Sequence, residues 1–348
     1  MGERMKAGRR AAWIAIPLML GAILTSPADA ADIVVTAYGG IWEKALRECY
    51  VTAFEKQTGK TVEVVLGSSP QWMNQVEANS ANPPIHVMMN GVAGALLAGE
   101  KGLVEKFTVD RVPSLANVPQ KFRDIVNDYG SVINYGAAGL AYNKDRIKNP
   151  PKTWKEFVDR TIKGEWTASL PTINYTDSLY ILIWNLADVM GGGATNVDPG
   201  FDAIKKLKAS GHVVWWSSVT EFLTQLQSGE AEIGIYWDGR TWAFHDDNKP
   251  WVGYVNPAPG GVAVPNIIQK VKNGPELAWR FVDIALSPGP QQCFAERLQY
   301  PVVNDKVVYP DKLKPRMAKL DEIRFSPAAE VQKNSAKWVE RWNKEIGR

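Results

Sequence analysis

The sequence holds few of the residues on which metal and redox sites depend. Among 348 residues there are only two cysteines and three histidines. Two cysteines cannot build a disulfide-rich scaffold, and three scattered histidines give a metal cluster little support. The histidines lie outside any catalytic motif, since neither Gly-x-Ser-x-Gly nor His-Glu-x-x-His occurs in the chain. We therefore expect a protein that has no metal or cofactor and is not an enzyme.

An excess of charge of either sign is also missing. Forty Lys and Arg residues stand against 37 Asp and Glu, which gives a formal net charge of +3 at pH 7. Nucleic-acid binders carry a strong basic excess or a basic stripe, so we expect no nucleic-acid partner. The chain has 45% hydrophobic and 22% charged residues, which is typical of a globular protein, and its length suits two lobes.

The one long hydrophobic run lies at the N-terminus. Met1 to Arg10 carries four basic residues and one acidic residue, Ala11 to Thr25 carries no charge, and Ala28-Asp29-Ala30 offers small residues to a signal peptidase. A membrane anchor is the alternative, but the uncharged run is shorter than the about 20 residues of a span and contains Pro17. We predict a signal peptide over residues 1–30, cleaved after Ala30, and an exported, soluble mature protein.

Tryptophan is abundant: the chain has 14 Trp beside 11 Tyr and 10 Phe. Such aromatic residues either fill a core or line a binding site. Cys49 and Cys293 would lie in an oxidising compartment, where a single disulfide is possible. Two buried free thiols explain the sequence equally well, so the pairing stays open.

Alternating strand and helix patterns follow the predicted signal peptide. An apolar, β-branched run over residues 32–38 predicts a buried strand, and residues 61–66 and 85–89 predict a second and a third strand. The helical pattern after the first strand ends at Gly59, and the next helix begins at Ser68. Because no hairpin signal separates these strands, we expect them to be parallel, with right-handed crossovers. Later in the chain we predict extended segments over 131–135, 139–143, 232–237 and 262–268 and helices over 178–190 and 275–286.

Several motifs then occur in a fixed order along the mature chain. They are Tyr142-Asn143-Lys144-Asp145, Pro150-Pro151, Thr153-Trp154-Lys155-Glu156-Phe157, Ser228 to Gly234 before Tyr236-Trp237-Asp238-Gly239, and Gln299 to Asn304. In these motifs the chain resembles the bacterial extracellular solute-binding proteins of ABC importers, and among them the spermidine/putrescine-binding branch.

The resemblance implies an α/β architecture, the two-lobed type 2 periplasmic binding protein fold, in which each lobe is a mainly parallel sheet flanked by helices. We expect residues 31–136 with 264–348 to form lobe 1 and residues 137–263 to form lobe 2, with hinge strands between them. A receptor of this kind is a periplasmic monomer that closes over a small-molecule ligand. It delivers the ligand to a permease and an ATPase of the inner membrane.

The resemblance also implies candidate ligand-binding residues at strand ends, where open α/β sheets bind ligands. Trp237 and Asp238 end a strand where the branch has Trp followed by a polar residue, so Trp237 is either an aromatic wall of the site or a core residue. Asp177 lies near the amine-binding carboxylates of the branch, although a helix N-terminus also favours an acidic residue. Tyr300, before Pro301, corresponds to a ligand-facing tyrosine of the branch.

A second group of candidates lies around the first two helices. Tyr38 and Gly40 precede the first helix, where backbone N–H groups can meet an anion. Trp42 and Trp72 begin the first and second helices, and each either packs in the core or contacts the ligand.

Departures from the polyamine branch decide the expected ligand. The returning hinge strand of the branch carries Trp and Asp, whereas residues 259–266 of this chain contain neither. Arg240 stands where the branch usually has a small residue, and a guanidinium binds a carboxylate bidentately and repels a polyamine. An ammonium ion needs a carboxylate or aromatic faces, which Asp177 and Trp237 offer. We therefore expect a zwitterion such as 4-aminobutyrate or a similar amino acid. Polyamine binding stays the alternative, with Arg240 then on the surface or paired with a neighbouring aspartate.

Overall fold

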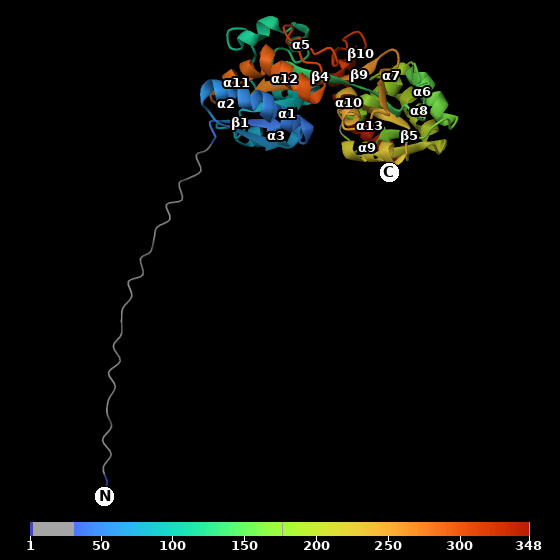
Figure 1. Ribbon diagram of the computed structural model, residues 1–348, viewed down its shortest axis with the longest axis horizontal. Helices are drawn as coiled ribbons and strands as arrows, with labels where there is room; N and C mark the ends of the chain where they lie inside the picture. Colours follow the sequence, from blue (N-terminus) through green and yellow to red (C-terminus); the bar gives the residue numbers. More distant parts are fainter. Residues whose placement is uncertain (3–30, 176, 348) are drawn as a thin grey trace. The chain divides into compact units, whose positions relative to one another are not determined.

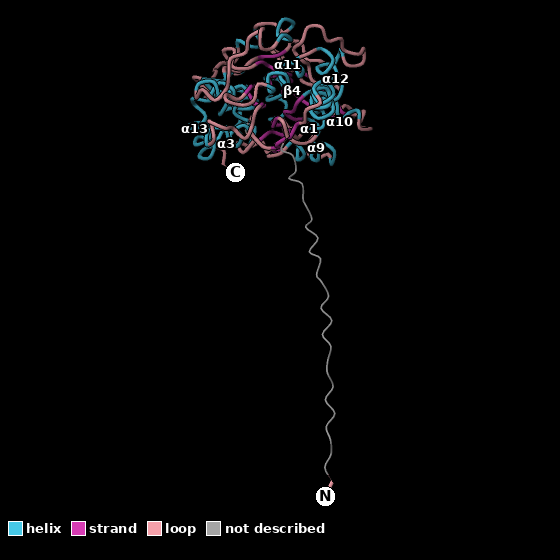
Figure 2. Tube along the Cα trace, turned by 90° about the vertical axis from the view of Figure 1, so that its left-hand side faces the viewer, coloured by secondary structure: helices cyan, strands magenta, loops and turns pink. Residues whose placement is uncertain are grey.

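The structure is a computed structural model that describes residues 1–2, 31–175 and 177–347. Residues 3–30 of the predicted signal peptide, together with its cleavage site, lie outside the described residues. Residues 31–348 form one compact unit, in which helices and loops enclose the strands (Figures 1 and 2).

The unit begins with three parallel strands, as the sequence predicts. β1 (Ile33–Ala37) pairs in parallel with β2 (Val62–Leu66) and with β3 (Val87–Gly91). The segment between β1 and β2 is helical throughout and comprises α1 (Ile41–Leu46), the π-helical η1 (Arg47–Val51) and α2 (Thr52–Thr58). It ends at Gly59, whose φ of 68° suits a glycine C-cap. α3 (Ser69–Ala78) begins with a capping box of Ser68 and Gln71, so both predicted helix boundaries are confirmed.

Two long strands join the halves of the sheet. The strand order is β2-β1-β3-β9-β4-β7-β5-β6, with β10 paired to β9 and β8 paired to β4. β4 (Ser131–Asn143) is antiparallel to β9 (Gly261–Lys270) along its first part and to β7 (Ile233–Trp237) and β8 (Val252–Val255) along its last part. The two extended segments predicted over 131–143 are therefore one continuous strand. It makes the sheet mixed, whereas β5, β6 and β7 are again parallel.

The second half of the sheet carries most of its own helices. Its remaining strands are β5 (Ala168–Pro171) and β6 (Val213–Trp216). Its helices are α6 (Trp154–Ile162), η3 (Leu179–Trp184), α7 (Asn185–Val189), α8 (Asp198–Ala209), α9 (Val219–Ser228) and α10 (Asp238–Asp246). The predicted helix over 178–190 corresponds to η3 and α7.

The remaining elements belong to the first half of the fold, except that the C-terminal part of the chain also contacts the second half. They are α4 (Val92–Glu100), η2 (Pro113–Asn117), α5 (Lys121–Asp124), α11 (Leu277–Leu286), α12 (Pro288–Leu298), η4 (Lys314–Arg316), β10 (Ile323–Arg324) and α13 (Ala328–Glu345). α13 contacts both halves: it packs on α4, and its Trp342 meets Trp215 of β6 edge-on at 5.4 Å. The predicted lobe boundaries stay a prediction, because α13 belongs to neither half alone.

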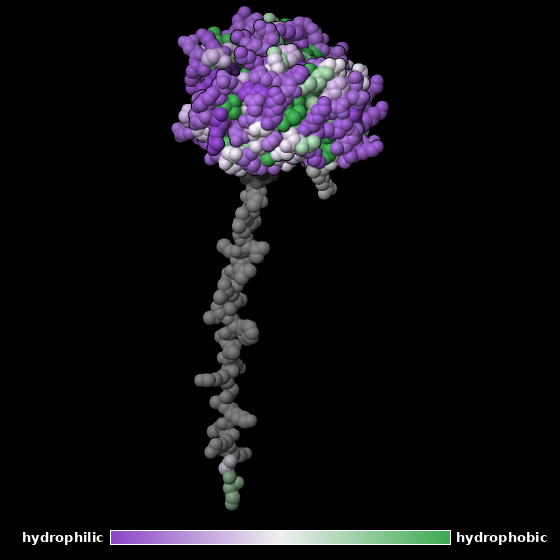
Figure 3. Space-filling view, turned by 90° about the vertical axis from the view of Figure 1, so that its right-hand side faces the viewer, coloured by the Kyte–Doolittle hydropathy of each residue, from purple (hydrophilic) through white to green (hydrophobic). Residues whose placement is uncertain are grey.

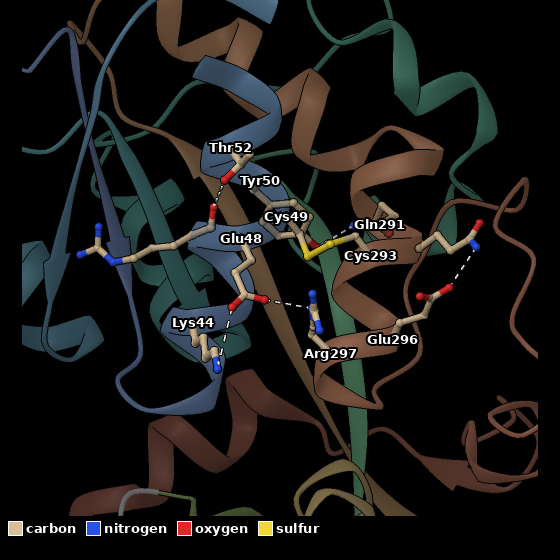
Figure 4. The surroundings of a disulfide bond; sticks show 11 residues. Lys44, Glu48, Cys49, Tyr50, Thr52, Gln291, Cys293, Glu296 and Arg297 are labelled. Atoms are coloured by element: carbon tan, nitrogen blue, oxygen red, sulfur yellow. Dashed lines mark hydrogen bonds and ion pairs between the residues drawn. A yellow bond between two sulfur atoms is a disulfide. The ribbon is translucent and has the colours of Figure 1, made fainter. Parts of the chain in front are cut away.

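A disulfide bond joins two helical segments that lie far apart in the sequence. Cys49 of η1 and Cys293 of α12 are bonded, with 5.6 Å between their Cα atoms (Figure 4). Around them Glu48 forms an ion pair with Arg297 at 2.9 Å, and Tyr50 stacks on Phe294 at 4.7 Å. The sequence allowed either a disulfide or two free thiols, and the structure shows that Cys49 and Cys293 form a disulfide.

In Figure 3 the visible face is largely hydrophilic, with hydrophobic residues in small patches among the hydrophilic ones. Among the described residues, no helix combines the length and the hydrophobicity needed to cross a membrane.

Candidate ligand site at the carboxyl ends of the strands

Strands from both halves of the sheet end at a common group of residues. Tyr38 directly follows β1, Asp177 lies between β5 and η3, and Arg240 lies in the first turn of α10, which follows β7. Asp177 interacts electrostatically with both Tyr38 and Arg240, so the three side chains lie near one another. The carboxyl ends of parallel strands are the usual place for ligands in open α/β sheets.

Asp177 and Arg240 are opposite charges without a direct ion pair. Burial raises the pKa of Asp177 to about 6, while Arg240 and the hydroxyl of Tyr175 oppose this shift by stabilising the carboxylate. Among the described residues, no basic group lies within 4.0 Å of the Asp177 carboxylate and no carboxylate lies within 4.0 Å of the Arg240 guanidinium. A small molecule with an ammonium and an anionic group is thus chemically suited to this pair.

Tyrosine hydroxyls surround the Arg240 guanidinium. Tyr175, Tyr236 and Tyr300 all interact with it electrostatically. Burial raises the pKa of each tyrosine above its ordinary value of 10.0, and Arg240 partly offsets that rise. The hydroxyls therefore stay protonated at neutral pH and can donate or accept hydrogen bonds. We call these residues the charge–tyrosine cluster: Tyr38, Tyr175, Asp177, Tyr236, Arg240 and Tyr300.

Trp237 lies behind the cluster in an aromatic stack. Its ring meets Tyr175 edge-on at 5.3 Å and Trp216 at 5.7 Å. Only 5% of Trp237 is exposed, whereas Tyr175 is partly exposed. Tyr175 thus presents the more accessible aromatic surface, and Trp237 supports it from the core.

Trp42 and Trp72 are buried and pack against the ring of the partly exposed Tyr38, as Trp237 packs against Tyr175. Their rings lie 5.3 Å and 5.5 Å from the Tyr38 ring, and they are 3% and 0% exposed. The structure therefore places both tryptophans behind Tyr38, as packing against it. Gly40 is exposed and has a φ of 75°, a conformation that L-residues rarely adopt. Contact of its backbone with an anion stays a prediction.

Tyr300 packs against the start of α10. A Cβ atom added to Gly239 would lie 2.4 Å from two ring carbons of Tyr300, and one added to Gly136 of β4 would lie 2.8 Å from that ring. Two glycines thus let the ring approach the backbone of both elements. This close packing sets the position of the Tyr300 hydroxyl beside Arg240.

Asp238 lies beside Tyr300, on a different face of α10 from Arg240. Residues two apart in an α-helix point about 200° from each other, so Asp238 and Arg240 emerge on opposite faces of α10. Asp238 is 1% exposed and lines a separate cavity of about 440 Å³ with Trp242, one turn further along the same face. Arg240 does not line that cavity. Asp238 therefore borders the charge–tyrosine cluster at Tyr300, and its contact with a ligand stays a prediction.

Sequence reasoning missed three hydroxyl residues of this region. Tyr175 and Tyr236 are neighbours of the predicted Asp177 and Trp237, and Ser69 forms a hydrogen bond with Tyr38 that favours its ionised form. Tyr175 and Tyr236 carry a signal that was available, because each stands in the same strand-end segment as a predicted residue. For Ser69 the sequence offered no signal other than its position at the start of a helix.

Comparisons with known proteins show the family and the fold of the chain. The family profile described as "Bacterial extracellular solute-binding protein" matches residues 83–324. A "putative extracellular solute-binding protein" structure from Bordetella parapertussis is 31% identical, with a TM-score of 0.81 over 90% of this chain and 98% of that one. The structure of a GABA receptor has a TM-score of 0.74 at 20% identity, over 89% and 96% of the two chains, which shows a shared fold.

Two sequence relatives carry names that state a ligand. The thiamine-binding periplasmic protein of Escherichia coli (strain K12) is 24% identical over 303 residues, which are 85% of this chain and 87% of that protein. The "putative 2-aminoethylphosphonate-binding periplasmic protein" of Salmonella typhimurium (strain LT2) is 24% identical over 152 residues, 42% of this chain and 43% of that protein.

The chain belongs to the bacterial extracellular solute-binding protein family. Members of this family are extracellular or periplasmic proteins that bind small molecules and work with ABC transporter components, and they are transport components rather than enzymes. The two-lobed periplasmic binding protein fold predicted from the sequence is confirmed. Within the part of the chain that the structure describes, no group of three or more His, Cys, Asp or Glu residues is placed to hold a metal ion.

Proposed function

We propose that this protein is the periplasmic receptor of an ABC importer for a small zwitterion with one amine and one anionic group, such as 4-aminobutyrate. The observation that carries the proposal is the charge–tyrosine cluster. It presents one carboxylate and one guanidinium, neither in an ion pair, at the carboxyl ends of strands from both halves of the sheet. The signal peptide, cleavage after Ala30 and a monomeric receptor are parts of this proposal.

In the proposed mechanism each end of the ligand binds one charge. Asp177 holds the ammonium, with the Tyr175 ring and, behind it, Trp237 as aromatic support. Arg240 binds the anionic end bidentately, and the tyrosine hydroxyls fill the remaining hydrogen-bond positions. Closure of the two lobes around β4 and β9 then removes water and strengthens both interactions, because the local dielectric falls. The closed receptor delivers the ligand to the permease.

Polyamine binding is the second candidate, supported by the motifs shared with the spermidine/putrescine branch. Asp177 and the aromatic rings fit one ammonium group of a polyamine. Arg240 argues against it, since no carboxylate of the described residues lies within 4.0 Å of the guanidinium to neutralise it. Thiamine and 2-aminoethylphosphonate, named for two relatives, belong in the same test. The latter has the zwitterionic pattern that the cluster suits.

Calorimetric titration of the mature protein (31–348) with these five ligands tests the proposal. We expect 4-aminobutyrate or 2-aminoethylphosphonate to bind more tightly than putrescine, spermidine or thiamine. Arg240→Ala should weaken that binding by about 30-fold or more, because it leaves a desolvated anion unpaired. Arg280→Ala is the control, since Arg280 is a half-exposed surface residue paired with Asp283 at 3.2 Å. Tight polyamine binding that is unchanged in Arg240→Ala would contradict the proposal of a zwitterionic ligand and favour polyamine binding.

A further inference from the structure

The cavity on the other face of α10 is a pocket that is partly open to solvent and has its own chemistry. It has a volume of about 440 Å³ and lies between α10, the chain from Tyr254 to Gly260 and the chain from Pro315 to Glu322. That volume falls within the range of roughly 300 to 1,000 Å³ that small-molecule sites occupy. None of the residues of the charge–tyrosine cluster lines it.

Asp238 gives this cavity a buried carboxyl with an unused oxygen. The residue is 1% exposed, and its Oδ1 accepts a hydrogen bond from the backbone N–H of Gly239 at 2.7 Å. Its Oδ2 is buried and has no hydrogen-bond partner among the described residues. A buried carboxyl oxygen without a donor costs free energy, so a bound molecule with an N–H group would be stabilised at this position.

Aromatic rings and acceptor oxygens make up the rest of the wall around Asp238. The rings of Trp242 and Tyr254 meet edge-on at 6.3 Å. The Tyr254 hydroxyl lies 2.7 Å from the carbonyl oxygen of Ala137 and 2.8 Å from Oδ1 of Asn256. One hydroxyl proton serves these two acceptors, so the Tyr254 hydroxyl has no further proton to donate to Asp238. Aromatic faces beside a carboxylate are the surroundings that an organic ammonium ion favours.

Two basic residues line the cavity, and the one beside the Trp242 ring, Arg316, has a compensating negative charge. Arg316 stacks over Trp242 at 5.0 Å and forms an ion pair with Asp246 at 2.8 Å. Lys152 is exposed, as is Glu322, which lines the same cavity. The Asp238 carboxyl is therefore the deepest charge of the cavity without an opposite partner.

We propose that this cavity is a second binding site, for a small primary ammonium ion that donates a hydrogen bond to Asp238 Oδ2 and packs its carbon chain against Trp242 and Tyr254. The site is distinct from the proposed zwitterion site, because no residue of the charge–tyrosine cluster lines the cavity. A receptor that fails to bind 4-aminobutyrate can still bind an ammonium ion in this cavity.

The site carries a pH dependence of defined sign. Burial raises the pKa of Asp238 to about 7, although the backbone hydrogen bond from Gly239 favours the carboxylate. The titratable groups that face it are Tyr135 of β4, Tyr254 of β8 and Tyr300, all of which burial keeps protonated at neutral pH. An ammonium ion pairs only with the carboxylate, so its affinity should rise about tenfold between pH 6 and pH 8.

Titration of the mature protein with ethylammonium chloride, followed by calorimetry and by ligand-observed nuclear magnetic resonance, tests this site. We expect saturable binding in the millimolar range, the ceiling for so few atoms, with ethanol as the uncharged control. Asp238→Asn should weaken the binding about tenfold or more and remove its pH dependence. Asp247→Asn, a change in an aspartate that is 75% exposed just after α10, should leave it unchanged.

Two further variants locate the bound ion and guard against misfolding. Trp242→Leu keeps Asp238 but removes the aromatic wall, and it should weaken ethylammonium binding while circular dichroism shows a native fold. Arg280→Ala should not change ethylammonium binding, since Arg280 is a half-exposed surface residue that does not line the cavity. The proposal would be overturned by a lack of saturable binding to the wild type, by equal binding to folded Asp238→Asn, or by unchanged binding to folded Trp242→Leu.

Discussion

At the scale of single residues, the protonation of Asp177 controls the charge–tyrosine cluster. Burial raises its pKa to about 6 from an ordinary value of 3.8, despite the nearby Arg240. The native state therefore binds this proton more tightly than the unfolded chain does. The charged carboxylate destabilises the native state above about pH 6, and this penalty disappears as the pH falls toward 3.8.

A pH series tests the role of Asp177. The affinity for the amine ligand should fall about tenfold between pH 7 and pH 5, because the carboxylate that holds the ammonium becomes protonated. Calorimetric titration at pH 5, 6 and 7 measures this change. Asp177→Asn should bind weakly at every pH with a flat profile, and a variant that keeps the wild-type profile would show that another group titrates.

At the scale of elements, the start of α10 organises both proposed sites. Gly239 lies between Asp238 and Arg240 and lets the Tyr300 ring pack directly on the helix backbone. Any side chain at this position must displace that ring, because its Cβ would lie 2.4 Å from two ring carbons and 2.8 Å from the carbonyl oxygen of Leu298. The helix start and the loop after α12 are thus packed as one unit.

Gly239→Ala tests this packing. We expect a loss of about 1–3 kcal/mol in the free energy of unfolding, typical of overpacking, and a weaker zwitterion affinity because Tyr300 moves away from Arg240. Chemical denaturation and calorimetry measure the two effects. The matched control is Gly289→Ala in α12, where an added Cβ meets no atom within 4 Å. A Gly239→Ala protein as stable as Gly289→Ala would contradict the close approach.

At the scale of the whole molecule, the disulfide closes most of the chain into one loop. Cys49 and Cys293 are 244 residues apart, and their bond ties η1 to α12 within the first half of the fold. Such a cross-link stabilises a protein mainly by restricting the unfolded chain. It lies outside the charge–tyrosine cluster, so stability and ligand binding should respond to its loss separately.

Replacing both cysteines with serine tests that separation. The Cys49→Ser/Cys293→Ser protein should lose about 2–5 kcal/mol of unfolding free energy while its ligand affinity changes little. Guanidinium unfolding with and without a reducing agent measures the first quantity, and calorimetry measures the second. A large loss of affinity in the folded double variant would show that the bond also positions the site.

The sequence predicts elements whose signals are local. β1, β2 and β3 stand out because each is a bounded apolar run, and Gly59 and Ser68 mark helix ends through capping chemistry that involves neighbouring residues only. The strands β5, β6 and β8 escaped prediction, since each has only four residues and too short an alternation to recognise. The antiparallel pairing of β4 with β9 joins segments that are more than a hundred residues apart and leaves no local mark.

For the candidate site too, some features can be predicted from the sequence and others are decided only by the tertiary structure. The sequence by itself determined the family, the strand-end positions of Asp177 and Arg240 and the charge pattern of the expected ligand, because residue types and motif order are written in the chain. Only the tertiary structure decided that Trp42, Trp72 and Trp237 lie behind tyrosines, that Cys49 and Cys293 are bonded, and that Asp238 and Arg240 point to opposite faces of α10. Those outcomes depend on how distant segments pack and where a helix begins, and neither is fixed by any one stretch of sequence.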